Sequence, residues 1–448
     1  MFCFYNNYRP DDVDCQYWFF FGGRFTVCGI GVIILWLFEQ AQIQYLSTLG
    51  GTMSSTVGTI SRGIKAPIIK TGDDLVSIAV DSLLAASGDT ETGFKIQDRD
   101  VFALTEAVVG RAQGNYATVD HIATDVRRKT GGGTVGLIFP ILSRNRFSLL
   151  LKGIAKGVDK LVIMLSYPSD EVGNHLMSID ALDEKGINPY SDVFTEKEVY
   201  DTFGEIKHPF TGMDYVALYK QMGGENTEII LANRPQEILK YTDTVINADI
   251  HTRFRTKRLL LEAGAKTVLS LHDILNESVD GSGYNSNYGI LGSNLATDNS
   301  VKLFPRDCQP LVEDIQKEVY KRTGKHIEVM VYGDGAFKDP VGKIWELADP
   351  VVSPGYTSGL EGTPNELKLK YLADNAIGNL SGDEAKQAIK DMIKAKPSNL
   401  VASQASQGTT PRRLTDLLGS LCDLTSGSGD KGTPFIYVQN YFTNYAND

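Results

Sequence analysis

Short apolar runs, each ending in a polar turn and followed by a helical pattern, recur along this chain. Such runs occupy residues 101–104, 136–142, 160–167, 244–250 and 327–331. This alternation is typical of α/β proteins, in which each run is a buried strand of a helix-covered sheet. Because open sheets of this kind bind ligands at the carboxyl ends of their strands, we looked there for a site.

The run at residues 327–331 leads into a Gly333-Asp334-Gly335 turn. The two glycines permit a sharp bend, which would present Asp334 at the end of the strand. A carboxylate in that place suits a hard divalent cation that bridges phosphates. An ordinary tight turn explains the same residues, because Asp and Gly are favoured in turns for conformational reasons. The sequence leaves both interpretations open.

Three further segments have the composition of phosphate or metal sites. Arg144 and Arg146 precede a helical run at 147–155, and we expect a capped helix start there that binds an anion, or else a solvated loop. Asp249 and His251 come at the end of the run at 244–250. The glycine-rich stretch before residue 434 carries Lys431 and either cradles phosphate or serves as a flexible connection.

Composition excludes several classes of protein. The net charge of −11 and the sequence pI near 5.2 argue against a general nucleic-acid surface, which needs clustered Lys and Arg. The chain contains no G-x-x-x-x-G-K-[ST] loop, no G-x-G-x-x-G after a strand, and no C-x-x-C, H-E-x-x-H or G-x-S-x-G motif. The common nucleotide-binding and protease motifs are therefore missing.

Residues 1–52 differ from the rest of the chain. They hold Cys3, Cys15 and Cys28, and an apolar run at 25–38 that is shorter than the ~20 residues a membrane helix needs. We interpret 1–52 as a non-native upstream extension translated in frame before Met53, or as a weak anchor. The two remaining cysteines fit a reducing compartment, so we expect a cytoplasmic protein without a membrane association.

The pattern of elements suggests three further parts. Residues 53–176 form an N-terminal α/β part with nucleotide segments, and residues 177–224, punctuated by Pro189 and Pro209, look like an inserted subdomain. Residues 225–448 contain the metal-site segment and the C-terminal nucleotide loop.

Five segments, in order, give the chain a family resemblance. They are APIIKTGDDL at 66–75, DRDVFALTEAVVGRAQG at 98–114, VINADIH at 245–251, IEVMVYGDGAFKDPVG at 327–342 and GTPFIYV at 432–438. Over residues 64–441 the chain resembles the coenzyme F-420:L-glutamate ligase family. The resemblance implies a mixed-sheet, two-domain α/β fold, neither Rossmann nor P-loop. It also implies a homodimer, with GTP or another NTP as co-substrate and Mg2+ or Mn2+ as cofactor.

The resemblance also implies roles for particular residues. Asp334 would be catalytic and hold metal, with Asp249 and His251 competing to be its partner, while Arg144 and Arg146 would neutralise the transferring phosphoryl group. Three positions depart from the family pattern: Arg111 replaces a lysine, Glu106 a hydroxyl residue and Gly335 a threonine. The implied nucleotide-binding residues are Ala66, Pro67, Ile68, Ile69, Glu106, Arg111, Gly427, Gly429, Asp430 and Lys431.

The function implied is a ligase that forms a γ-glutamyl or other amide bond through an acyl phosphate. Its partners would be L-glutamate or another amine donor and a small acceptor that bears a carboxylate or phosphate. Two alternatives remain open on the same scaffold. One is a non-catalytic nucleotide- or metabolite-binding protein, and the other is a metal-dependent phosphohydrolase in which water replaces the amine.

Overall fold

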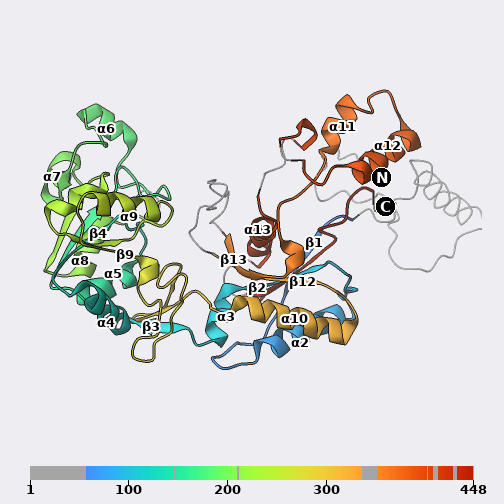
Figure 1. Ribbon diagram of the computed structural model, residues 1–448, viewed down its shortest axis with the longest axis horizontal. Helices are drawn as coiled ribbons and strands as arrows, with labels where there is room; N and C mark the ends of the chain where they lie inside the picture. Colours follow the sequence, from blue (N-terminus) through green and yellow to red (C-terminus); the bar gives the residue numbers. More distant parts are fainter. Residues whose placement is uncertain are drawn as a thin grey trace, which may run out of the picture.

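The computed structural model describes residues 57–144, 147–208, 211–334, 351–400, 402–406, 412–426 and 431–446, without the side chains of Asp334, Val351 and Val352. These residues form two lobes, each built on its own β-sheet, with a small third sheet between them (Figure 1). The segment interpreted as an upstream extension or anchor, 1–52, lies outside this range. Within the range, no helix combines the length and the apolarity needed to cross a membrane.

The first lobe contains a mixed five-stranded sheet in the order β1-β14-β2-β12-β13. Strands β2 and β12 are parallel, and the other neighbours are antiparallel. The strands are β1 Ile60–Ile64, β2 Val101–Thr105, β12 Glu328–Asp334, β13 Val351–Tyr356 and β14 Phe435–Gln439.

Helices cover both faces of this sheet. Helices α2 and α10 pack on one face, where Phe102 and Leu104 join their core, and α13 packs on the other face against Val101 and Ala103. This alternation follows from the period of two residues along a strand. The lobe's helices are α2 Leu75–Ser87, α3 Glu106–Ala112, α10 Cys308–Thr323, α11 Leu369–Asn375, α12 Gly382–Ala395 and α13 Leu414–Ser426, with short 3-10 helices at Ser358–Leu360 and Gln404–Ser406.

The second lobe contains a six-stranded sheet in the order β6-β7-β5-β4-β8-β9. All neighbours are parallel except β6 and β7. Taken along the chain, the parallel strands are therefore ordered third, second, first, fourth and fifth, which is a doubly wound arrangement. The strands are β4 Thr134–Ile138, β5 Lys160–Leu165, β6 Phe194–Thr195, β7 Thr227–Leu231, β8 Thr244–Asn247 and β9 Thr267–Ser270.

Helices α4, α5 and α8 cover one face of the second sheet, and α9 and a 3-10 helix cover the other. The segment 177–224, expected as an inserted subdomain, supplies α6, β6, α7 and α8, and its buried side chains join the same core as α4 and α5. The lobe's helices are α4 Val119–Thr130, α5 Ser148–Lys156, α6 Ile179–Lys185, α7 Glu196–Phe203, α8 Tyr215–Gly223 and α9 Arg253–Glu262, with 3-10 helices at Pro235–Lys240 and Leu271–Asp273.

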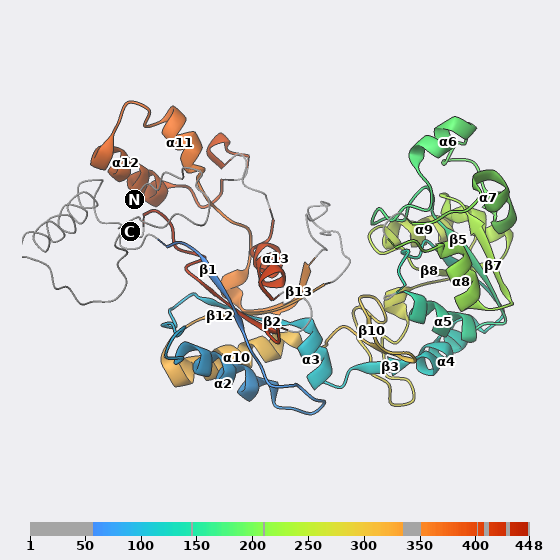
Figure 2. The same cartoon turned by 180° about the vertical axis from the view of Figure 1, so that it is seen from behind.

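A three-stranded sheet lies between the lobes in both views (Figure 2). It pairs β3 Tyr116–Thr118 with β11 Ser300–Lys302, and β11 with β10 Asn294–Thr297. The chain leaves the first lobe after α3 and re-enters it at α10. The second lobe is thus inserted between these two helices.

The predicted α/β class with mixed sheets is confirmed. The apolar residues Leu75, Ile78, Ala79 and Leu83 recur at helical spacing, which predicts a helix through Ser87. Helix α2 confirms this prediction, and Asp74 caps it by accepting from the Ser77 N–H at 3.2 Å. Two details were wrong. The strand predicted at 136–142 ends at Ile138, because Phe139 adopts a positive φ of 53° before Pro140. The helix start beside Arg144 has no side-chain cap, since the apolar Phe147 occupies the cap position.

Candidate nucleotide site

Three segments far apart in the sequence line one cavity of about 440 Å³ in the first lobe. They are the loop before α2, helix α3 with the preceding Thr105, and the end of α13 together with residues 431–434. Backbone hydrogen bonds hold them together: Ala66 N–H donates to the Gly432 carbonyl at 3.1 Å, and Thr105 N–H donates to the Pro434 carbonyl at 3.0 Å. The lining residues are Ala66, Pro67, Ile68, Ile69, Thr105, Ala107, Val108, Arg111, Asp423, Ser426, Lys431, Gly432, Thr433 and Pro434.

Six of the residues assigned to the nucleotide from the sequence therefore meet in this cavity: Ala66, Pro67, Ile68, Ile69, Arg111 and Lys431. The antiparallel pairing of β1 with β14 and of β14 with β2 brings their segments to one edge of the sheet. Of the other four, Glu106 does not line the cavity, and Gly427, Gly429 and Asp430 lie outside the described residues.

The cavity presents an apolar side chain and two cations to solvent. Ile68 is 80% exposed, an unusual degree for isoleucine, and Arg111 and Lys431 are also exposed. Arg111 is held at the end of α3 by its carbonyl, which accepts from the Thr71 hydroxyl at 3.3 Å. An exposed apolar surface beside basic side chains can accommodate a flat ring attached to phosphates.

Glu106 occupies a different position from the cavity lining. Its side chain is buried, with Lys302 Nζ at 3.6 Å and Asn294 Nδ2 at 3.4 Å. It also lies against the backbone of Gly333, where a Cβ would come within 2.1 Å of Glu106 Cγ. The first residue of α3 thus points toward the end of β12 while its neighbours line the cavity.

Asp334 is the last residue of β12. Because β2 and β12 are parallel, with Thr105 opposite Tyr332, the ends of both strands meet at one edge, where Glu106 and Asp334 follow. The Asp334 side chain and Gly335 lie outside the described residues. The sheet therefore places two acidic residues at one edge, beside the nucleotide cavity.

Asp249 and His251, expected as metal partners of Asp334, belong to the second lobe. The buried Asp249 carboxylate accepts from the Thr252 N–H at 2.9 Å and from the hydroxyls of Thr252 and Thr256, at the start of α9. His251 Nδ1 lies 2.9 Å from a carboxylate oxygen of Glu171. The structure therefore does not bring this pair to the end of β12 (Figures 1 and 2).

Glu171 is central to this second network. It accepts from the backbone N–H groups of Ile250 at 2.6 Å and His251 at 3.0 Å. Burial raises the pKa of the Glu171 carboxyl, and the hydrogen bond from His251 opposes that shift. Glu171 lies 80 residues before His251 in the sequence, and the fold pairs it with residues that follow β8.

The remaining assignments are Arg144 and Arg146, which were expected to neutralise the transferring phosphoryl group. Arg144 is exposed after β4, and Arg146 lies outside the described residues. Among the residues that the structure describes, no group of three His, Cys, Asp or Glu side chains could hold a metal ion. The metal and catalytic assignments made from the sequence remain predictions.

Sequence reasoning missed several lining residues and one cation. Thr105 ends β2 and Thr433 precedes β14, and both line the cavity because these two strands pair, which the sequence does not reveal. Lys302 reaches Glu106 from β11, a strand of three residues, and no local pattern signals that contact.

The mixed sheets define an α/β protein, and this arrangement is consistent with a ligase-type fold. Residues 63–440 match the family model of the F420-0:Gamma-glutamyl ligases, which is most of the chain, so the protein belongs to this family. No curated protein matched the sequence. The resemblance inferred from five segments is thus confirmed, and membership of a ligase family supports an enzymatic role.

Proposed function

We propose that this protein is an NTP- and divalent-metal-dependent ligase that forms a γ-glutamyl or other amide bond through an acyl phosphate. The observation that carries this proposal is the single cavity lined by residues 66–69, Arg111 and Lys431, three segments that converge only in the fold. Family membership supports the ligase class.

The cavity accounts for nucleotide binding by the chemistry of its walls. Ile68 offers an apolar surface to the base, and the guanidinium of Arg111 and the ammonium of Lys431 neutralise phosphate charge. GTP is the expected nucleotide, carried by the family resemblance.

A divalent cation fits best where β2 and β12 end. Glu106 carries a carboxylate there, and Asp334, as the last residue of β12, would provide a second, since carboxylate oxygens are the ligands that Mg2+ and Mn2+ prefer. Such an ion would neutralise the charge of the transferring phosphoryl group. The Asp249 carboxylate already accepts three hydrogen bonds within its own lobe, so we leave Asp249 and His251 out of this proposed set.

The reaction proceeds in two displacements. An oxygen of the acceptor carboxylate attacks the γ-phosphorus, the bond to the bridging oxygen breaks, and the nucleoside diphosphate leaves. The amine of L-glutamate then attacks the acyl carbon, loses a proton, and displaces inorganic phosphate. Arg111 and Lys431 contribute by holding the negative charge of the nucleotide in place. We expect a homodimer that works in the cytoplasm.

The test is phosphate release from GTP or ATP with Mn2+, L-glutamate and a panel of small carboxylate acceptors. We expect release that depends on the acceptor, and a KM for nucleotide raised at least about tenfold in Arg111→Ala. Arg258→Ala is the matched control, because Arg258 makes only an exposed ion pair with Glu262 on α9.

Other results would replace the proposal. Phosphate release without any acceptor identifies a phosphohydrolase. Nucleotide binding without turnover for every acceptor identifies a non-catalytic binding protein. An unchanged KM for nucleotide in Arg111→Ala would mean that the nucleotide does not bind in this cavity.

A further inference from the structure

We propose that the second lobe carries a separate small-molecule site that takes a neutral, largely apolar compound with a lactam or amide edge. The site is an open cavity of about 510 Å³, within the ~300–1,000 Å³ usual for small ligands. This cavity is separate from the proposed nucleotide cavity. Binding of a ligand there goes beyond the proposed ligase function. The cavity is lined by Gly173, His175, Leu176, Met177, Ser178, Ile179, Asp180, Lys207 and His208.

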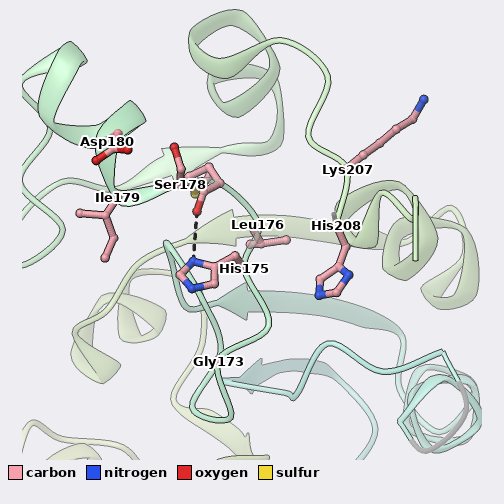
Figure 3. Close-up of a pocket in the computed structure, with 9 residues that line it drawn as sticks. Gly173, His175, Leu176, Ser178, Ile179, Asp180, Lys207 and His208 are labelled. Carbon is pink, nitrogen blue, oxygen red and sulfur yellow. Dashed lines mark hydrogen bonds between the residues drawn. The ribbon is translucent and has the colours of Figure 1, made fainter. Parts of the chain in front are cut away.

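The cavity lies where a doubly wound sheet binds ligands. Residues 173–180 follow β5, and residues 207–208 belong to the loop before α8 and β7. Strands β5 and β7 are parallel neighbours in the second sheet, so the cavity opens beyond their carboxyl ends. Figure 3 shows the loops that carry the lining residues above the strands of this sheet.

The loop after β5 is fixed by its own hydrogen bonds. The buried Asp170 carboxylate accepts from the backbone N–H groups of Val172 at 3.0 Å and Asn174 at 2.8 Å. It also accepts from Leu142 N–H at 2.8 Å, which ties the loop to the residues after β4. The Leu176 N–H donates to the Pro168 carbonyl at 2.8 Å. The cavity is therefore preformed rather than assembled around a ligand.

Two imidazoles give the cavity a donor and an acceptor. His175 Nδ1 lies 3.3 Å from the Met177 carbonyl, which can only accept, so Nδ1 carries the proton and Nε2 accepts. His208 Nδ1 accepts from the Thr211 N–H at 3.3 Å, so its Nε2 carries the proton and donates. Figure 3 shows the two rings on either side of Leu176. A lactam or amide can donate its N–H to one imidazole and accept with its C=O from the other.

The other lining groups favour a neutral ligand over an anion. The ammonium of Lys207 points away from the cavity in Figure 3 and pairs with Glu205 at 2.5 Å. The Ser178 hydroxyl oxygen accepts from Ala181 N–H at 3.1 Å, which leaves its hydrogen to donate to a carbonyl. Leu176 and Met177 are buried and supply apolar surface. Asp180 is the remaining charged residue of the lining, and it repels anions.

The test uses full-length protein labelled with 13C in its methionine methyl groups, of which the chain has eight. The Met177 signal is assigned from Met177→Leu, and 2-quinolone is the probe, as an aromatic lactam. We expect a saturable shift of the Met177 signal with a Kd of about 1 mM or lower, whereas the signal of Met330, buried in the first lobe, stays in place.

Variants of the lining residues test whether the probe binds in this cavity. His208→Leu removes one donated hydrogen bond and is expected to raise the Kd about tenfold, and Leu176→Trp fills the cavity and is expected to abolish the shift. The signal of Met164, which is buried in the core of the second lobe, reports whether each variant is folded. His326→Leu is the matched control, since His326 stacks on Tyr320 in the first lobe, and its Kd should equal that of the wild type.

Three results would overturn the site. The first is the absence of a saturable shift of Met177 at about 10 mM probe, and the second is an unchanged Kd in folded His208→Leu. The third is displacement of the probe by GTP, which would place it in the nucleotide cavity. Tighter binding of 2-naphthoate than of 2-quinolone would reject the neutral class of ligand.

Discussion

Gly333 leaves space for the Glu106 side chain because glycine has no Cβ. A Cβ at Gly333 would lie 2.1 Å from Cγ and 2.7 Å from Cβ of Glu106, which is much closer than real contacts allow. Gly333→Ala must therefore displace Glu106 or bend β12. We expect a loss of about 1–3 kcal/mol in the free energy of unfolding, measured by urea denaturation, together with weaker Mn2+ binding.

Gly133→Ala is the control for this prediction. A Cβ at Gly133 would meet nothing within 4 Å, and its φ is not positive. That variant should change the free energy of unfolding by no more than about 0.5 kcal/mol. Equal effects of the two alanines would mean that Glu106 does not pack against the end of β12.

Asp249 tests which lobe binds the metal. Asp249→Asn weakens the hydrogen bonds from Thr252 and Thr256, so we expect the free energy of unfolding to fall by about 1–3 kcal/mol. Bound Mn2+, measured by electron paramagnetic resonance, should be retained. Asp334→Asn should have the opposite effect, with a normal fold and loss of Mn2+ binding. Loss of Mn2+ in Asp249→Asn would move the metal to the second lobe.

At the scale of elements, local patterns in the sequence indicated the longer helices and the buried strands. The apolar spacing of Leu75, Ala79 and Leu83 predicted α2, and these side chains are buried. The short strands β3 and β11 could not be predicted, because Thr118 pairs with Ser300 and neither segment is a strand without the other. A strand of three residues carries too little pattern to be recognised.

The candidate site likewise combines segments that the sequence predicts with contacts that only the fold shows. Residues 66–69 and Lys431 were identified from their family motif, but their proximity depends on the pairing of β1 with β14. The direction of the Glu106 side chain depends on Gly333 and Lys302, which arrive on other strands. Motifs therefore indicated which segments matter, and tertiary packing decided which side chains meet.

Helix α4 offers a matched pair of ion-pair deletions. The Asp125 side chain is fully buried and accepts from Arg128, Lys129 and the Leu275 N–H, each at 2.7 Å, which ties α4 to the loop after β9. Asp159 pairs only with Arg127, and its side chain is 68% exposed. We expect Asp125→Ala to lower the free energy of unfolding by about 2–3 kcal/mol.

Asp159→Ala should lower it by less than about 1 kcal/mol, because solvent screens an exposed pair. Thermal or urea denaturation of both variants measures the difference. A small effect of Asp125→Ala would show that the loop after β9 is held to α4 by apolar contacts such as those of Leu275 rather than by this carboxylate.

At the scale of the whole molecule, the described residues form separate apolar cores. Two clusters cover the faces of the second sheet and draw on residues 117–303, and two others cover the first sheet and draw on residues 64–112 and 308–442. The chain passes between the lobes twice, after α3 and before α10. Polar contacts link these two connections, such as the hydrogen bond from Asn115 Nδ2 to the Phe304 carbonyl at 2.8 Å. Lobes with separate cores can unfold separately.

This arrangement predicts where a nucleotide stabilises the protein. GTP bound in the first-lobe cavity at 100 times its Kd should stabilise that lobe by about 2.7 kcal/mol and leave the second lobe unchanged. Calorimetry should then show two transitions, of which one moves with GTP. Hydrogen exchange should slow in β2, β12 and α10 but not in β4, β5 and β8, because only the first three belong to the core of the first lobe. A single transition, or equal slowing in both lobes, would mean that the junction couples the two cores into one cooperative unit.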